Sequence, residues 1–210
     1  MDYFIFGLQR SGTNYLEQLI NQNFTARRAN KANKSWKHSI NVPNHYNSSR
    51  PTFIIYKNPY TWVESICLRN TVDWLKTQKT YPAQKGPNEL RLGSDNINVE
   101  SLAKTYKHFH NTWLWNKTNS TSTCVLRYES LLIDESREEA LENMSRFLPV
   151  RKSNKWINPQ RGKVSQSKDY NKDREQYYLS MQPKQLTRTH IDAINDVLGD
   201  RIESMGYDKL

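Results

Sequence analysis

Continuous apolar runs alternate with stretches of helical periodicity along this chain. The runs at residues 3–6 (YFIF) and 52–56 (TFIIY) are typical of strands buried on both faces of a sheet, and a third strand is expected at about 123–128. Behind the first run, Leu16, Leu19 and Ile20 recur at helical spacing. The repeated order of strand, loop and helix predicts an α/β protein with a mainly parallel sheet and helices on both faces.

Later segments extend this pattern. Apolar residues at helical spacing predict helices from residue 102, over residues 138–148 and from residue 191 onward. The alternation of Trp36, His38 and Ile40 predicts a further short strand within SWKHSI.

Two stretches lack such periodicity. Residues 77–98 are rich in Gly, Pro, Lys and Asn, and residues 150–175 are polar and basic. Long segments of this kind are commonly either functional loops or disordered. We therefore expect one domain over residues 1–210, with a lid or loop insertion at about 70–100.

Charge and hydropathy narrow the class of protein. The formal net charge of +10 favours an anionic partner. No apolar run approaches the roughly 20 residues that span a bilayer, and the first strand leaves no room for a signal peptide before it. We therefore expect a cytoplasmic protein that does not enter a membrane. Cys67 and Cys124 lie in apolar periodic segments and are expected to be reduced core thiols.

Nucleic-acid binding is a rival explanation of the positive charge. The 6 Trp and 12 Tyr residues offer surfaces on which bases stack. However, the basic residues are scattered along the chain, and neither a zinc knuckle nor an RNA-recognition signature is present. These features disfavour a nucleic-acid partner.

The loop behind the first strand has the spacing of a phosphate-binding loop. Gly7 and Gly12 match the two glycines of GxxxxGK[ST], a loop whose backbone N–H groups contact phosphate at the start of a helix. Thr13 stands where that motif has lysine, and the cation of this loop is Arg10. The sequence therefore predicts an anion site that differs from that of a kinase.

A second loop follows the strand at residues 52–56 and reads Lys57-Asn58-Pro59. Pro59 suits the first turn of a helix. In a parallel sheet, ligands bind beyond the carboxyl ends of the strands. The two loops are therefore expected to contribute to one site.

Together, the two loops resemble those of the sulfotransferase family, whose fold is similar to that of P-loop nucleotide kinases and whose donor is 3′-phosphoadenosine 5′-phosphosulfate (PAPS). The first loop of that family is a basic residue followed by Ser, Gly, Thr and a hydroxyl residue. This chain is similar at Arg10, Ser11, Gly12, Thr13 and Asn14, with asparagine at the last position. VLRYESLL and MGY also resemble later segments of the family, and Glu129 is there expected to be a structural hydrogen-bond acceptor.

The resemblance implies how PAPS and its product, adenosine 3′,5′-bisphosphate, are bound. Lys57 and Ser65 stand at the two ends of the second family motif, which grips the 3′-phosphate. The family's third phosphate contact is expected from PQRGKVSQS, where a solvated basic loop is the alternative; its candidates are Arg161, Gly162 and Lys163. No metal is expected, because the loop lacks the kinase lysine and no zinc-ligand spacing is present.

The resemblance also implies a general base between the two phosphate motifs, where His38 and His45 lie. His38 is preferred because a strand-like segment holds an imidazole still, although a structural histidine is the common alternative. Lys37 is either a surface charge or a cation near the bridging oxygen. Arg10 is expected to stabilise the charge on the departing phosphate.

These expectations define the predicted function. The chain is expected to move the sulfuryl group from PAPS to a hydroxyl of a carbohydrate or small molecule. One alternative is a nucleotide kinase-like P-loop protein, which would need a loop lysine and magnesium. Another is a non-catalytic module that binds a nucleotide or nucleic acid.

Overall fold

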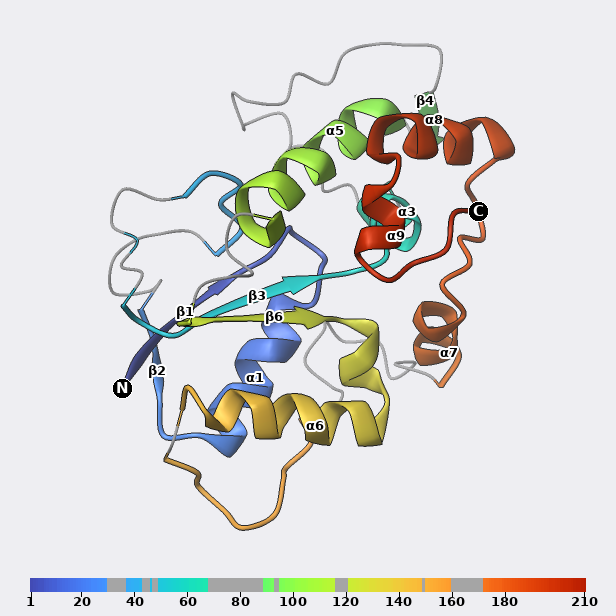
Figure 1. The fold of residues 1–210 in the computed structure, drawn as a ribbon. Helices are drawn as coiled ribbons and strands as arrows, with labels where there is room; N and C mark the ends of the chain where they lie inside the picture. Colours follow the sequence, from blue (N-terminus) through green and yellow to red (C-terminus); the bar gives the residue numbers. More distant parts are fainter. Residues whose placement is uncertain are drawn as a thin grey trace. The chain divides into compact units, whose positions relative to one another are not determined.

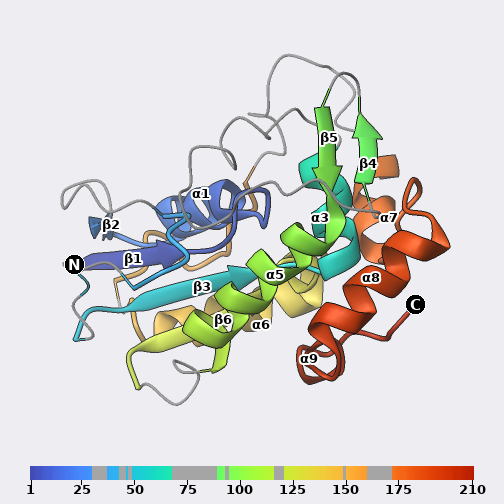
Figure 2. The same cartoon turned by 90° about the horizontal axis from the view of Figure 1, so that it is seen from above.

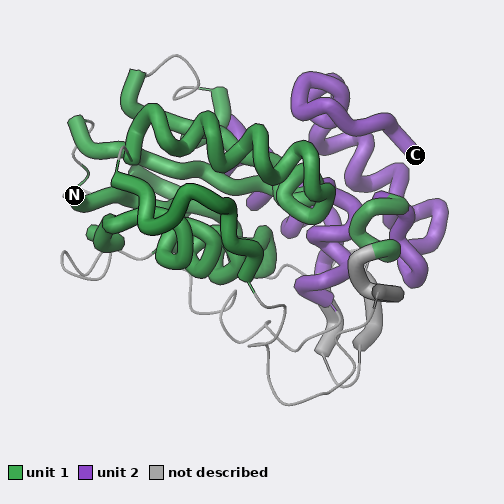
Figure 3. Tube along the Cα trace, turned by 90° about the horizontal axis from the view of Figure 1, so that it is seen from below, with its two compact units in different colours: residues 1–57, 112–180 green, residues 58–111, 181–210 purple. Residues whose placement is uncertain are grey.

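The computed structural model describes residues 1–29, 37–42, 46, 49–67, 89–92, 95–115, 121–148, 150–159 and 172–210. The chain divides into two compact units (Figure 3). Unit 1 consists of Met1–Lys57 and Thr112–Ser180, and unit 2 consists of Asn58–Asn111 and Met181–Leu210.

Unit 1 contains a four-stranded sheet in which all neighbouring strands are parallel (Figure 1). The strand order is β2-β1-β3-β6. The strands are β1 (Asp2–Phe6), β2 (Arg27–Arg28), β3 (Thr52–Tyr56) and β6 (Thr123–Arg127). The prediction of an α/β protein with a parallel sheet is therefore confirmed, and the three longer strands lie where the apolar runs placed them.

One face of this sheet packs on helices α1 (Thr13–Asn23) and α6 (Asp134–Ser145), which lie on the same side of the strands in Figure 1. Such a layer is stabilised because each Å² of apolar surface removed from water contributes about 25 cal/mol of free energy. The core of this layer joins strand and helix residues; among them are Tyr3, Ile5, Leu16, Leu19, Ile20, Phe53, Ile55, Leu141 and Met144.

Aromatic residues cover the other face of β1 within unit 1. The ring of Phe6 stacks on Trp113 with the centroids 4.1 Å apart, and Tyr46 meets Trp113 edge-on at 5.7 Å. The indole N–H of Trp113 donates to the Ser39 carbonyl at 3.0 Å. Trp113 belongs to η1 (His110–Trp115), a π-helical turn that continues the periodic pattern predicted from residue 102.

Unit 2 is mainly helical. Its helices are α3 (Pro59–Cys67), α5 (Val99–Phe109), α8 (Arg188–Leu198) and α9 (Arg201–Ser204). Strands β4 (Glu89–Leu92) and β5 (Asp95–Asn98) form an antiparallel pair (Figure 2).

Helix caps explain where two of these helices begin. The Asn98 side chain accepts from Ser101 N at 3.0 Å at the start of α5. At the start of α8, Thr187 and His190 cap each other's backbone N–H groups. Such caps satisfy N–H groups that have no partner within the helix.

Several sequence predictions need correction or completion. The short strand at 35–40 is wrong for residues 37–40, which form a turn and a bend. The helix α7 (Lys172–Ser180) and the β4–β5 pair were not predicted. The expected lid at 70–100 lies largely outside the described residues.

Other expectations have a simpler outcome. Cys67 and Cys124 are buried free thiols, as predicted. Among the described helices, none has the length and apolar character to cross a membrane. Two expectations stay predictions: that the chain is a single domain, and that helices cover both faces of the sheet.

Candidate functional site

The loop that joins β1 to α1 depends on its two glycines. A Cβ atom at Gly7 would lie 2.6 Å from the Ile55 carbonyl oxygen and 2.7 Å from Ser11 Oγ. Gly12 has a φ of +96°, and a Cβ there would lie 2.2 Å from the Tyr128 ring. Glycine alone fits such close approaches and a left-handed backbone without strain.

The middle of the loop is a tight turn. Ser11 donates to the Leu8 carbonyl twice, through its backbone N at 3.1 Å and through its Oγ at 2.6 Å. Arg10 adopts a positive φ of 69°, which is uncommon for a residue with a side chain. Gly12, the N-cap residue of α1, has no side chain to cap the first N–H groups of the helix. This arrangement suits an anion at the helix N-terminus.

His38 contacts the start of this loop. Its Nδ1 atom lies 2.9 Å from the Gly7 carbonyl oxygen, while Gly7 N donates to the Lys37 carbonyl at 3.0 Å. A carbonyl only accepts, so this contact assigns the proton to Nδ1. The Gly7 carbonyl thus pairs with a side chain, whereas a neighbouring strand would pair with it through a backbone N–H group. This contact is consistent with a turn at residues 37–40 in place of a strand.

Burial changes the ionisation of His38. Desolvation lowers its pKa to about 4, against the opposing effect of the Gly7 carbonyl, and the positive charges of Lys37 and Arg28 add to the lowering. The imidazole is therefore neutral at physiological pH.

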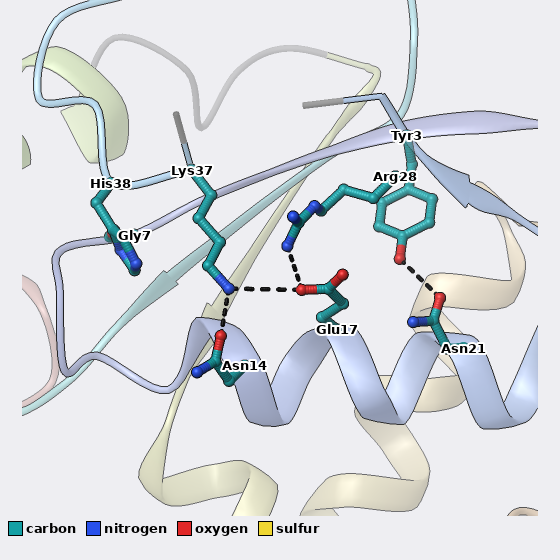
Figure 4. A network of polar contacts seen from close by, with 8 residues as sticks. All are labelled: Tyr3, Gly7, Asn14, Glu17, Asn21, Arg28, Lys37 and His38. Carbon is teal, nitrogen blue, oxygen red and sulfur yellow. Dashed lines mark hydrogen bonds and ion pairs between the residues drawn. The ribbon is translucent and has the colours of Figure 1, made fainter. Parts of the chain in front are cut away.

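Lys37 lies beside the first turns of α1. Its Nζ atom contacts the Asn14 side-chain oxygen and lies 3.4 Å from Glu17 Oε2 (Figure 4). The same Glu17 oxygen pairs with Arg28, and the side chains of all three charged residues are largely buried. A single carboxylate thus holds two cations next to the start of the helix.

Lys57 follows the carboxyl end of β3 and is fully buried, with a relative exposure of 0%. Its Nζ atom lies 4.1 Å from the centre of the Tyr178 ring, which belongs to α7. Desolvation lowers the Lys57 pKa to about 8; Tyr178 and Glu129 oppose this change, whereas the charge of Arg10 adds to it. Lys57 is thus a buried cation with an aromatic and an acidic neighbour.

The segment that follows β6 in the sequence also lies at this edge of the sheet. The ring of Tyr128 approaches Gly12 and meets the Tyr178 ring edge-on, with centroids 5.5 Å apart. Glu129 is 2% exposed, and its Oε2 atom lies 3.7 Å from Arg127 Nε. Among the described residues, the carboxyl ends of β1, β3 and β6 therefore carry the glycine loop, the buried Lys57 and the buried carboxylate of Glu129.

Most of the predicted site residues share unit 1. The β1 loop, the start of α1 and the end of β3 supply Arg10, Ser11, Gly12, Thr13, Asn14 and Lys57, and the turn at residues 37–40 supplies Lys37 and His38. Ser65 belongs to α3 in unit 2, where its hydroxyl donates to the Trp62 carbonyl at 2.9 Å. Arg161, Gly162, Lys163 and His45 lie outside the described residues.

The contact of Tyr178 with this site was not predicted, and Glu129 was predicted only as a structural hydrogen-bond acceptor. Tyr178 lies in a polar segment without apolar periodicity, so neither the helix α7 nor its contact with Lys57 was expected. For Glu129, the signal was present: an acidic residue just after a buried strand lies at the edge where Lys57 was expected.

The part of the chain that the structure describes contains no group of three or more His, Cys, Asp or Glu residues arranged to hold a metal ion. Comparison of the whole chain with models of protein families, with curated proteins and with solved structures finds no match. The function must therefore be argued from the site itself.

Proposed function

We propose that this protein is a PAPS-dependent sulfotransferase with a fold like that of P-loop nucleotide kinases, and that it transfers the sulfuryl group to a hydroxyl of a carbohydrate or small molecule. The observation that carries the proposal is a glycine loop without a lysine at the helix start, in the same unit as the fully buried Lys57. A donor with two separate anionic ends suits these two features.

The loop suits the phosphosulfate end of the donor. Gly12 leaves the N-terminus of α1 open to an anion, and Arg10 supplies a cation from the turn before it. Negative charge that grows on the departing phosphate would be stabilised by these groups, which are already in place before the reaction.

Lys57 suits the 3′-phosphate. A buried lysine destabilises the folded protein unless its charge is compensated, and a phosphate monoester would supply that compensation when bound. Ser65 as a second contact to this phosphate rests on the family resemblance.

His38 is the proposed general base. With a proton on Nδ1 toward Gly7, Nε2 is the basic atom of the ring. The lowered pKa keeps this nitrogen unprotonated over a wide range, so we expect the acid limb of the pH–rate profile to lie well below 6.5.

A nucleotide kinase-like function is the second candidate, and Lys37 is the observation that favours it. Its ammonium group contacts Asn14 in the first turn of α1, near the position at which kinases carry a lysine. Against this candidate, Lys37 is held by Asn14 and Glu17, and the sequence lacks the loop lysine itself.

A ligand panel separates these candidates. We expect adenosine 3′,5′-bisphosphate to raise the melting temperature in the presence of a chelator, because a ligand at 100 times its Kd adds about 2.7 kcal/mol. Stabilisation by ATP with magnesium alone would replace the proposal with a kinase. Stabilisation by an oligonucleotide alone would replace it with a nucleic-acid binding module.

Turnover is tested after binding. PAPS is incubated with a panel of sugars, phenols and alcohols, and transfer of the sulfuryl group is followed with a labelled donor. His38→Asn should abolish turnover and keep the affinity for the bisphosphate within a few-fold of the parent. Turnover by the His38→Asn protein would remove His38 as the base and leave His45 as the candidate.

A further inference from the structure

We propose that Glu129 and Tyr178 are positioning residues for Lys57: they hold its buried ammonium group in the charged form and thereby set the pH range in which this site binds a phosphate monoester. The inference rests on the proposed function and deepens it.

The burial of Lys57 creates the need for such residues. With 0% exposure, its ammonium group has lost the water that stabilises a charge. A lysine in this situation loses its proton unless nearby groups favour the charged form. A neutral amine would bind a phosphate dianion far less tightly than an ammonium group does.

Tyr178 supplies the first compensating contact. The face of its ring lies 4.1 Å from Lys57 Nζ, a distance at which the electron-rich ring attracts a cation. Hydrogen bonding with the Tyr178 hydroxyl also favours the charged lysine. The edge-on contact with Tyr128 fixes the ring, and Tyr128 itself packs on Gly12 of the anion loop.

Glu129 supplies the compensating charge. Strands β3 and β6 pair in register at Tyr56 and Arg127, and Tyr128 N donates to the Tyr56 carbonyl at 2.8 Å. Lys57 and Glu129 therefore leave neighbouring strands at adjacent points. At 2% exposure, the carboxylate acts on Lys57 through a poorly solvated environment, in which charges interact strongly.

The charges around Lys57 also indicate which ligand fits. Among the described residues, the titratable groups that act on it include Tyr178 from α7, Glu129 from η2 (Glu129–Leu132) and Arg10 from the β1 loop. Arg127 shares the Glu129 carboxylate. Of the described groups named here, Lys57, Arg10 and Arg127 are cations and Glu129 is a carboxylate, so a dianionic phosphate complements the net positive charge around Lys57.

The direct test follows the ionisation of Lys57 by NMR in protein with labelled lysine, assigned with Lys57→Met. We expect a titration near pH 8 in the parent protein and a value about one unit lower in Glu129→Gln. Tyr178→Phe, which keeps the ring, should lower it less than Tyr178→Leu. Glu142→Gln, on the exposed surface of α6, is the matched control and should change nothing.

The second readout is the affinity for adenosine 3′,5′-bisphosphate as a function of pH. In the parent protein this affinity should fall above pH 8, and in Glu129→Gln it should already fall from about pH 7. Glu129→Asp should restore most of the pH dependence of the parent. If Glu129→Gln does not fold, the comparison of Tyr178→Phe with Tyr178→Leu tests the inference.

These outcomes separate the two proposals. A Lys57 titration that is unchanged in both Glu129→Gln and Tyr178→Leu, or that moves equally in Glu142→Gln, would overturn the inference. If the titration shifts as expected but no phosphate-bearing nucleotide binds, Glu129 and Tyr178 still position Lys57, and the proposed function is the part that fails.

Discussion

The two ends of the parallel sheet in unit 1 treat charge in opposite ways. At the amino end, Asp2 pairs with Arg27 at 3.0 Å and with Arg50 at 3.5 Å, and the Arg27 side chain is 75% exposed. At the carboxyl end, Lys57 and Glu129 are almost fully buried. The same sheet thus carries solvated pairs at one end and desolvated charges at the other.

This difference indicates where the fold serves something besides its own stability. Exposed ion pairs contribute little to stability, because water and salt screen them. Buried charges cost free energy, and apolar residues of similar size often stabilise a protein as well or better. The carboxyl end is therefore where we expect a ligand, as parallel sheets in general would suggest.

The largest effect on the carboxyl end is expected from Gly12→Ala. The new Cβ would lie 2.2 Å from the Tyr128 ring at a φ of +96°, so overpacking and backbone strain together should cost roughly 3 to 5 kcal/mol. Urea unfolding measures this loss. Gly199→Ala is the control, because its φ of +55° strains the backbone while no atom lies within 4 Å. Equal losses in the two variants would contradict the close packing of Tyr128 on the loop.

A somewhat smaller effect is expected from the acid titration of His38. The unfolded chain takes up a proton at this imidazole near the ordinary value of 6.5, whereas the folded protein does so only near pH 4. The free energy of unfolding should therefore fall by about 3 kcal/mol between pH 7 and pH 4.

His38→Asn isolates that contribution, since its amide still donates to the Gly7 carbonyl but does not titrate. Urea unfolding at several pH values should give a shallower acid dependence for His38→Asn than for the parent. An identical dependence in the two proteins would show that His38 is not held neutral.

The titration of Lys57 affects stability on the alkaline side of neutral pH. The folded protein loses this proton near pH 8 and the unfolded chain near 10.5, so the burial penalty is complete below pH 8 and shrinks as the pH rises. Lys57→Met removes the penalty. Its stability relative to the parent should therefore decrease by about 2 kcal/mol between pH 7.5 and pH 9.5.

The exposed Lys104 provides the comparison for that variant, because its side chain is 62% exposed in an i,i+4 pair with Glu100. Lys104→Met should show no such change with pH. If the effect of Lys57→Met on the free energy of unfolding did not depend on pH, burial of the Lys57 charge would not destabilise the folded protein.

The smallest effect is expected at the amino end of the sheet. Asp2→Asn removes the acceptor of both arginine contacts, yet these groups stay solvated. The midpoint of urea unfolding should stay within experimental error of the parent, and added salt should change little. A loss of more than about 1 kcal/mol in Asp2→Asn would remove the contrast between the two ends.

The sequence predicted the sheet well because its strands are continuous apolar runs. The phosphate-loop spacing also located the glycines correctly, since both need close backbone approach. His38 and Lys37 contact this loop from a turn instead of from the predicted strand: the His38 ring and the Lys37 carbonyl both contact the backbone of Gly7.

Long-range contacts account for what the sequence could not predict. Tyr178 is far from Lys57 in the chain and lies on a helix without an apolar stripe, so no local pattern joins the two residues. The exposure of a side chain is likewise a property of the folded protein. Nothing in Lys57-Asn58-Pro59 indicated that this lysine is fully buried, whereas the Lys104 side chain is 62% exposed.

Lys57 is proposed to recognise the second phosphate of a nucleotide. Calorimetric titration with adenosine 3′,5′-bisphosphate and with adenosine 5′-monophosphate, both with chelator at pH 7, tests it in the parent and in Lys57→Met. We expect the parent to prefer the bisphosphate, and Lys57→Met to lose about ten- to a hundred-fold of affinity for it while keeping its affinity for the monophosphate. Equal weakening for both ligands, or no preference in the parent protein, would contradict the claim.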